Sequence, residues 1–104
     1  MNKANLTIND VLPPLVADMY SLVPAVSAVL HSIEDGIWRF WIFTSNQQYD
    51  DVLMSELIDI EMAILDRWTD VLIDIRYVPL VLVSSYRDAT GSGAAVLWER
   101  EVRS

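Results

Sequence analysis

The dipeptide Asp35-Gly36 constrains the fold of this chain most, because it separates two runs rich in β-forming residues. Asp-Gly is a strong signal for a two-residue hairpin turn, since both positions tolerate a positive φ. The runs on either side are residues 26–33 and 37–44, and the second run is aromatic and β-branched. We therefore predict a β-hairpin made of strands 26–33 and 37–44.

A hairpin about this turn decides which side chains share a face of the sheet. The first face carries the pairs Ile33–Trp38, His31–Phe40 and Val29–Ile42, and the second carries Ser32–Arg39, Leu30–Trp41 and Ala28–Phe43. The first face is almost wholly apolar, whereas the second is apolar at its base and polar near the turn. Because so apolar a second face needs covering, we expect the first helix or another copy of the chain to lie on it.

One helix is predicted before the hairpin in the sequence and one after it. The longer is at 47–68, where apolar side chains recur with a helical period and form one broad stripe. A short N-terminal helix is predicted at 13–22, because Pro13 and Pro14 are favourable in a first helical turn. Pro24 follows the predicted end of this helix.

Two further strands are predicted at 71–78 and 94–100, joined through a loop at 84–93. A right-handed crossover through the long helix sets strand 71–78 parallel to strand 37–44 and allows it to lie beside 26–33. With one helix packed on the sheet, these elements predict an α+β fold. Its sheet is expected to be mostly antiparallel, with roughly three to five strands in a single domain.

The composition excludes several classes of protein. The chain has 104 residues, of which 53% are hydrophobic, so intrinsic disorder is excluded. There are 15 acidic residues against 7 basic ones, and direct nucleic-acid binding needs the opposite balance. No apolar run is long enough for a membrane helix, and no signal-peptide pattern opens the chain, so we expect a cytoplasmic protein.

The residue types also argue against a metal or cofactor site. The chain has no Cys and one His, which leaves no thiolate ligands, disulfides or paired-His site. No glycine-rich phosphate loop with a nearby Lys is present, and no Ser nucleophile motif stands out. We therefore predict no cofactor, no metal and no catalytic residue.

Negative charge is concentrated in one part of the chain. Residues 50–74 hold eight acidic residues and a single basic one, Arg67. Asp59, Asp66 and Asp70 fall on the face opposite the apolar stripe of helix 47–68. This acidic face is either a solvated surface that aids solubility or a docking face for a basic protein partner, including a mimic of a phosphate backbone.

One carboxylate, Glu61, falls inside the apolar stripe of the long helix. An ionised carboxylate is rarely buried without a partner, because desolvation costs several kcal/mol. His31 is its natural partner if the first face of the hairpin meets this helix, and Arg39 if the second face does. Glu61, His31 and Arg39 are thus either structural polar groups or the lining of a pocket between helix and sheet.

A candidate interface lies on the second face of the hairpin. Trp41, Phe43 and Leu30 share this face with Arg39, and Arg76 extends it if the strands are neighbours. Aromatic and Arg side chains on an apolar surface with a polar margin are typical of protein interfaces. Unless the first helix covers them, these residues predict a homodimer or a partner at this face.

Four segments carry a resemblance to known sequences. They are residues 38–44, 61–68, 73–76 and 93–100, with the sequences WRFWIFT, EMAILDRW, IDIR and GAAVLWER. Together they resemble a class of small bacterial α+β open reading frames, some of them carried as mobile, integron-type cassettes. The resemblance implies a bacterial, cytoplasmic, accessory protein, and it implies no activity and no site residues.

The sequence favours a non-enzymatic interaction module that acts as a homodimer through an apolar sheet face or edge. One alternative is a small-molecule binder or enzyme with a pocket between helix 47–68 and the sheet, using Glu61, His31 or Arg39. Another is an acidic decoy for a nucleic-acid-binding protein. The oligomeric state and the position of Glu61 distinguish the first two.

Overall fold

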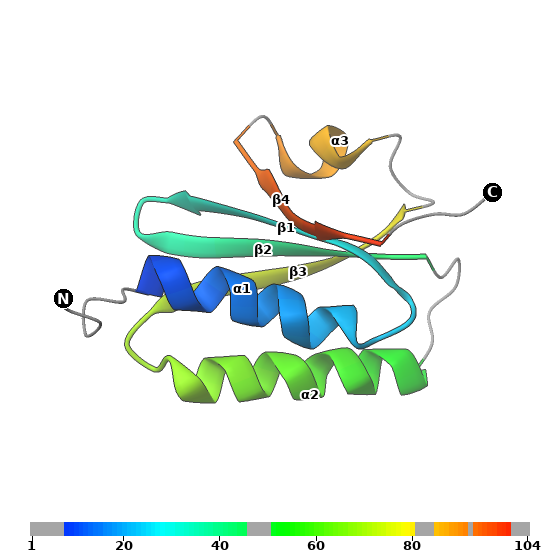
Figure 1. Ribbon diagram of the computed structural model, residues 1–104, viewed down its shortest axis with the longest axis horizontal. Coiled ribbons are helices and arrows are strands. Elements are labelled where there is room, and N and C mark those ends of the chain that lie inside the picture. Colours follow the sequence, from blue (N-terminus) through cyan, green and yellow to red (C-terminus); the bar gives the residue numbers. More distant parts are fainter. Residues whose placement is uncertain (1–7, 46–50, 81–84, 92, 101–104) are drawn as a thin grey trace, which may run out of the picture.

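The computed structural model describes residues 8–45, 51–80, 85–91 and 93–100. It has an α+β fold in which two helices lie on one face of a four-stranded mixed sheet (Figure 1). The strand order is β3-β2-β1-β4. In chain order the elements are α1 (Ile8–Ser21), β1 (Val26–Glu34), β2 (Ile37–Thr44), α2 (Asp51–Arg67), β3 (Leu72–Pro79), α3 (Tyr86–Thr90) and β4 (Ala95–Glu99).

The predicted hairpin is confirmed residue by residue. Asp35 and Gly36 have φ angles of 55° and 78°, the left-handed values that a two-residue turn needs. The observed register of β1 against β2 contains all six predicted pairs, from Ile33 with Trp38 to Ala28 with Phe43. The two faces of the hairpin therefore carry the predicted side chains.

Strand β3 is parallel to β2, as the crossover through α2 predicts. It pairs with β2 and not with β1, so the expectation that strand 71–78 lies beside 26–33 is wrong. The place beside β1 belongs to β4, which is antiparallel to it. After β2 the chain passes through α2 and returns as β3 on the side of β2 that β1 does not occupy. Strand β3 is therefore an edge of the sheet.

The helices differ from their predicted bounds. Helix α1 begins at Ile8 instead of residue 13, so Pro13 and Pro14 lie inside it. Both prolines have no N–H to donate to the preceding turn, yet the helix continues through them because its apolar stripe is buried. Leu12 and Tyr20 in this stripe are fully buried. Helix α2 covers Asp51–Arg67, and the predicted residues 47–50 lie outside the described residues.

Both long helices pack on the first face of the sheet, and the main core lies between the helices and the sheet. Its buried residues are Leu12, Val16, Tyr20, Val23, Val26, Val29, Trp38, Phe40, Ile42, Leu53, Leu57 and Ile64. On the second face a smaller core is formed by Ala28, Leu30, Trp41 and Phe43. Tyr86 and Ala89 of α3 pack against it. The expectation that the first helix covers this second face is therefore wrong.

Helix α3 lies within the segment predicted as a loop. It has five residues, which is too short for a helical period to be read from the sequence. Phe43 anchors it, since the rings of Phe43 and Tyr86 lie 4.8 Å apart between centroids. The Tyr86 hydroxyl donates to Glu99 at 2.6 Å, which ties α3 to β4.

Candidate functional site

Glu61 belongs to a hydrogen-bonded cluster that joins α1, α2 and β3. The Tyr77 hydroxyl lies 2.9 Å from Glu61 Oε1 and 3.0 Å from the Leu57 carbonyl oxygen, and it donates to these two acceptors. The Tyr20 hydroxyl lies 2.9 Å from Tyr77 Oη. Because the single Tyr77 proton faces two acceptors, Tyr20 is the donor in that bond. The predicted pairs of Glu61 with His31 or Arg39 are therefore wrong.

The environment of this cluster keeps both tyrosines neutral. Burial raises the pKa of Tyr77 far above its usual value, and the Tyr20 and Glu61 neighbours raise it further. Burial likewise raises the pKa of Tyr20. The neutral Tyr77 phenol donates to a carboxylate, and this hydrogen-bonded cluster links α1, α2 and β3. The cluster therefore accounts for a carboxylate inside the apolar stripe without requiring a pocket.

His31 lies on the first face of the sheet, beside Phe40. The two rings are stacked with centroids 6.2 Å apart. Burial lowers the pKa of His31, which favours the uncharged imidazole. Its Nδ1 atom is buried and has no hydrogen-bond partner among the described residues. His31 is thus half-buried at the margin of the main core, and it forms no hydrogen bond or ion pair with Glu61.

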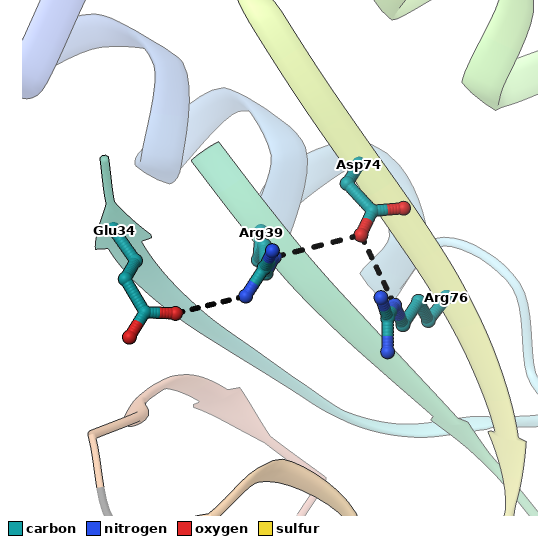
Figure 2. Close-up of polar contacts among 4 residues, drawn as sticks. All are labelled: Glu34, Arg39, Asp74 and Arg76. Carbon is teal, nitrogen blue, oxygen red and sulfur yellow. Dashed lines mark hydrogen bonds and ion pairs between the residues drawn. The ribbon is translucent and has the colours of Figure 1, made fainter. Parts of the chain in front are cut away.

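Arg39 lies on the opposite face of the sheet from Glu61, within a row of four charged side chains (Figure 2). Its Nη1 donates to Glu34 Oε1 at 2.9 Å, and its Nε lies 3.7 Å from Asp74 Oδ2. Arg76 Nε donates to the same Asp74 oxygen at 3.0 Å. The charges alternate in sign along the row, and each exposed pair contributes about 0–1 kcal/mol.

The structure separates the four residues of the predicted interface. Trp41, Phe43 and Leu30 are 5%, 0% and 3% exposed, because α3 and its neighbours cover them within the same chain. Arg76 is the exception, with 56% of its side chain exposed. An interface through the second sheet face would therefore meet mainly the charged row around Arg39 and Arg76.

Described residues other than Glu61 and His31 line two surface hollows. One of about 320 Å³ lies on the second face beside the hairpin turn, between Arg39, Trp41 and the segment at Thr90 and Gly91. The other, of about 330 Å³, lies between α1 and α2. Each has a volume at the lower end of the range for small-molecule sites.

The second hollow lies between α1 and α2, next to part of the predicted acidic face. It has a volume of about 330 Å³ and is lined by Met19, Leu22, Val23, Glu56, Asp59 and Ile60. Asp59, Asp66 and Asp70 are all exposed, as the helical stripe predicts. The two acids in this hollow stand beside apolar side chains of both helices.

Strand β3 forms one edge of the sheet. This strand pairs with β2 on one side and has no neighbouring strand on the other among the described residues. It runs for eight residues in unbroken register with β2, from Leu72 opposite Ile37 to Pro79 opposite Thr44. An unpaired strand of this kind presents a row of free backbone donors and acceptors to another chain.

The other edge, β4, is less suited to pairing. It has only five residues, and a shift in its register against β1 marks a bulge near Leu97. Arg100 follows directly and donates to the carbonyl oxygens of Ser21, Val23 and Val26 at 3.0–3.2 Å. Short length, a bulge and a charged end are the features with which proteins protect a sheet edge.

Exposed apolar side chains accompany the β3 edge. Leu72, at the start of the strand, is 65% exposed, and Ile58 and Met62 of α2 are 45% and 54% exposed. At about 100° per residue, these two lie beyond Glu61 on the flank of α2 turned away from α1. Since Glu61 bonds to Tyr77 of β3, this flank stands over the β3 side of the sheet.

Sequence reasoning placed the candidate interface residues on a sheet face and allowed for a sheet edge, but it did not identify which strand forms that edge. The alternation of residues 73–77 sets Asp74 and Arg76 on one face and three large side chains on the other, which predicts a strand but not its place in the sheet. That alternation was predicted and is confirmed, since Asp74 and Arg76 lie opposite Arg39 and Trp41 in the register. Only the strand order reveals that the strand is an edge.

Comparison with protein-family models, with curated proteins and with solved structures found no match. Within the described ranges, no helix is long and apolar enough to cross a membrane. In the same part of the chain, no group of three or more His, Asp or Glu side chains is placed to hold a metal ion. The function must therefore be argued from the geometry itself.

Proposed function

We propose that this protein is a non-enzymatic interaction module that acts as a homodimer through the β3 edge of its sheet. The observation that carries the proposal is an uninterrupted eight-residue edge strand flanked by exposed apolar residues of α2. A cytoplasmic, accessory role in a bacterium is part of the proposal, as the sequence resemblance implies.

The charged and polar side chains support an interaction role over a catalytic one. Glu61 is bonded to Tyr77, and Arg39 is bonded to Glu34, so each of these groups already serves the fold. The predicted face residues Trp41, Phe43 and Leu30 are covered by the chain itself. The β3 edge and the exposed apolar residues beside it still lack cover, and a second copy of the chain can supply it.

Sedimentation equilibrium over a range of concentrations tests this function. We expect a mass twice that of the 11.8 kDa chain at micromolar concentration or above. Ile58→Asp places a charge on the flank of α2 over the β3 edge and is expected to weaken the dimer. Val52→Asp is the matched control, because Val52 is 72% exposed on the opposite flank of the same helix. A monomer at the highest attainable concentration would refute the proposal.

A further inference from the structure

The charge pattern of β3 is negative then positive, and it becomes positive then negative when the strand is reversed, so the pattern is complementary to itself across a two-fold axis. Asp74 and Arg76 lie on the second face of the sheet, with Ile75 between them on the helix face. Both charged side chains are accessible, with 37% and 56% of their surfaces exposed. In a two-fold interface, residue i of one copy meets residue j of the other and j meets i.

Backbone geometry limits how two copies of β3 can pair. Along a strand, successive residues direct their N–H and C=O groups to opposite sides, so alternate residues face the free edge. In an antiparallel ladder, residues that face the partner pair with one another. Two copies of the same strand can therefore align only in registers whose centre falls on a residue, and not between two residues.

From this we infer that two copies pair through antiparallel β3 strands centred on Ile75, so that Asp74 of each copy lies opposite Arg76 of the other. The inference rests on the proposed homodimer and specifies its register. It joins two four-stranded sheets into one continuous sheet with α1 and α2 of both copies on the same face. Direct cross-strand pairs of opposite charge stabilise a sheet, and this register has two of them.

The neighbouring registers are disfavoured by the same side chains. Centring the pair on residue 74 sets two aspartates opposite each other, and centring it on 76 does the same with two arginines. Like charges directly opposite are destabilising, so the charge pattern selects the register that lies between these two. Arg39 supports the selected register, because it lies opposite Asp74 within the chain. Asp74 pairs with Arg39 and Arg76 of its own copy, and in this register it would also face Arg76 of the other.

The helix face fits the same alignment. Ile75 meets its own counterpart at the two-fold axis, and Ile73 meets Tyr77, so apolar side chains that are half-buried in one copy gain cover. The exposed flank of α2, with Ile58 and Met62, is brought towards the same flank of the second copy. Charge on one face and apolar contact on the other are thus satisfied by a single register.

Complementary charge variants test the register. Asp74→Lys makes the pattern positive at both positions, and Arg76→Glu makes it negative at both. Each variant alone is expected to dissociate with a Kd at least about tenfold above that of the wild type, because two attractive pairs become repulsive. When the two variants are mixed, every charge meets its opposite, and a heterodimer is expected. Native mass spectrometry separates the species when one variant carries a short tag.

Matched controls carry the same charge changes elsewhere. Asp66→Lys on the exposed face of α2 and Arg87→Glu on α3 are expected to self-associate as the wild type does and to mix statistically. If the single variants fail to fold by circular dichroism, Asp74→Arg with Arg76→Asp in one chain provides the test. That chain reverses both charges and is expected to regain self-association.

The outcomes distinguish the register from the proposed function. A wild-type dimer whose Asp74→Lys and Arg76→Glu variants mix statistically would overturn the register and leave the homodimer in place. A reversed double variant that folds but stays monomeric beside a dimeric wild type would overturn the register too. A monomeric wild type would overturn both the register and the homodimer.

Discussion

The substitution Tyr77→Phe tests how much the hydrogen-bonded cluster that joins α1, α2 and β3 contributes to stability. It removes one hydroxyl that lies 2.9–3.0 Å from Glu61, Leu57 and Tyr20, and it leaves the ring in place without a cavity. Loss of a hydrogen bond to a carboxylate costs about 1.5–3 kcal/mol. The Tyr20 hydroxyl, whose residue is 0% exposed, would also lose its acceptor, at about 1–3 kcal/mol.

Glu61 is only half-buried, so water can replace part of its lost bond. We therefore expect the free energy of unfolding to fall by about 2–4 kcal/mol. For a chain of this size, the Tm should drop by roughly 10 °C or more. Urea denaturation followed by tryptophan fluorescence, at one fixed protein concentration, measures the change.

Two further variants provide the controls. Tyr20→Phe removes a single neutral bond and should cost about 0.5–1.5 kcal/mol, because Tyr77 keeps its two acceptors. Combining it with Tyr77→Phe should cost less than the sum of the two, since no hydroxyl is then stranded. Tyr86→Phe removes an exposed bond to Glu99 and should cost under about 1 kcal/mol. A Tyr77→Phe protein within about 0.5 kcal/mol of the wild type, or strict additivity in the pair, would refute the reasoning.

Four other predictions concern the turn, the end of the sheet and pH. Gly36→Ala should cost about 1 kcal/mol, because φ is +78° there, whereas Gly93→Ala, with open space and no positive φ, should be near neutral in the same denaturation assay. Arg100→Lys should cost about 1–2 kcal/mol, since an ammonium cannot reproduce the planar fork that reaches three carbonyl oxygens; an unchanged urea midpoint would contradict this. Burial lowers the pKa of His31, so the unfolded chain takes up this proton first, and stability should be lost as the pH falls below about 6.5. Burial raises the pKa of Tyr77, so its contribution is present below about pH 10 and lost as the pH rises further; in Tyr77→Phe the alkaline loss should be smaller.

The hairpin was predictable because its information is local. Asp35 and Gly36 admit the φ values of a two-residue turn, and once the turn is set, every pair down to Ala28 and Phe43 follows. The parallel setting of β3 was predictable for a similar reason, since a helix of the length of α2 carries the chain back to the same end of the sheet. In both cases short-range geometry decides the outcome.

The partner of Glu61 was not predictable, because it depends on which strand lies under α2. The sequence placed Tyr77 on the apolar face of its strand, but a strand beside 26–33 would have left it away from Glu61. The start of α1 was misplaced for a different reason. Local preference put the prolines in the first turn, while burial of Leu12 and packing of Ile8 against the core extended the helix to the N-terminal side of them. Both features depend on tertiary packing, which local sequence preferences do not report.

Charged residues at a sheet edge usually prevent association, and the pattern on β3 explains why they need not do so here. Two charges of the same sign would repel a second copy in every register that sets them opposite each other. Asp74 and Arg76 have opposite signs and stand two residues apart, so their sum is zero and each can face the other across a two-fold axis. Such an edge favours strands with this alternation, because an apolar or like-charged residue opposite Asp74 or Arg76 would add no opposite charge to the pairs that these two form within the chain. The same two residues would then provide both attraction to a second copy and preference for it over other strands.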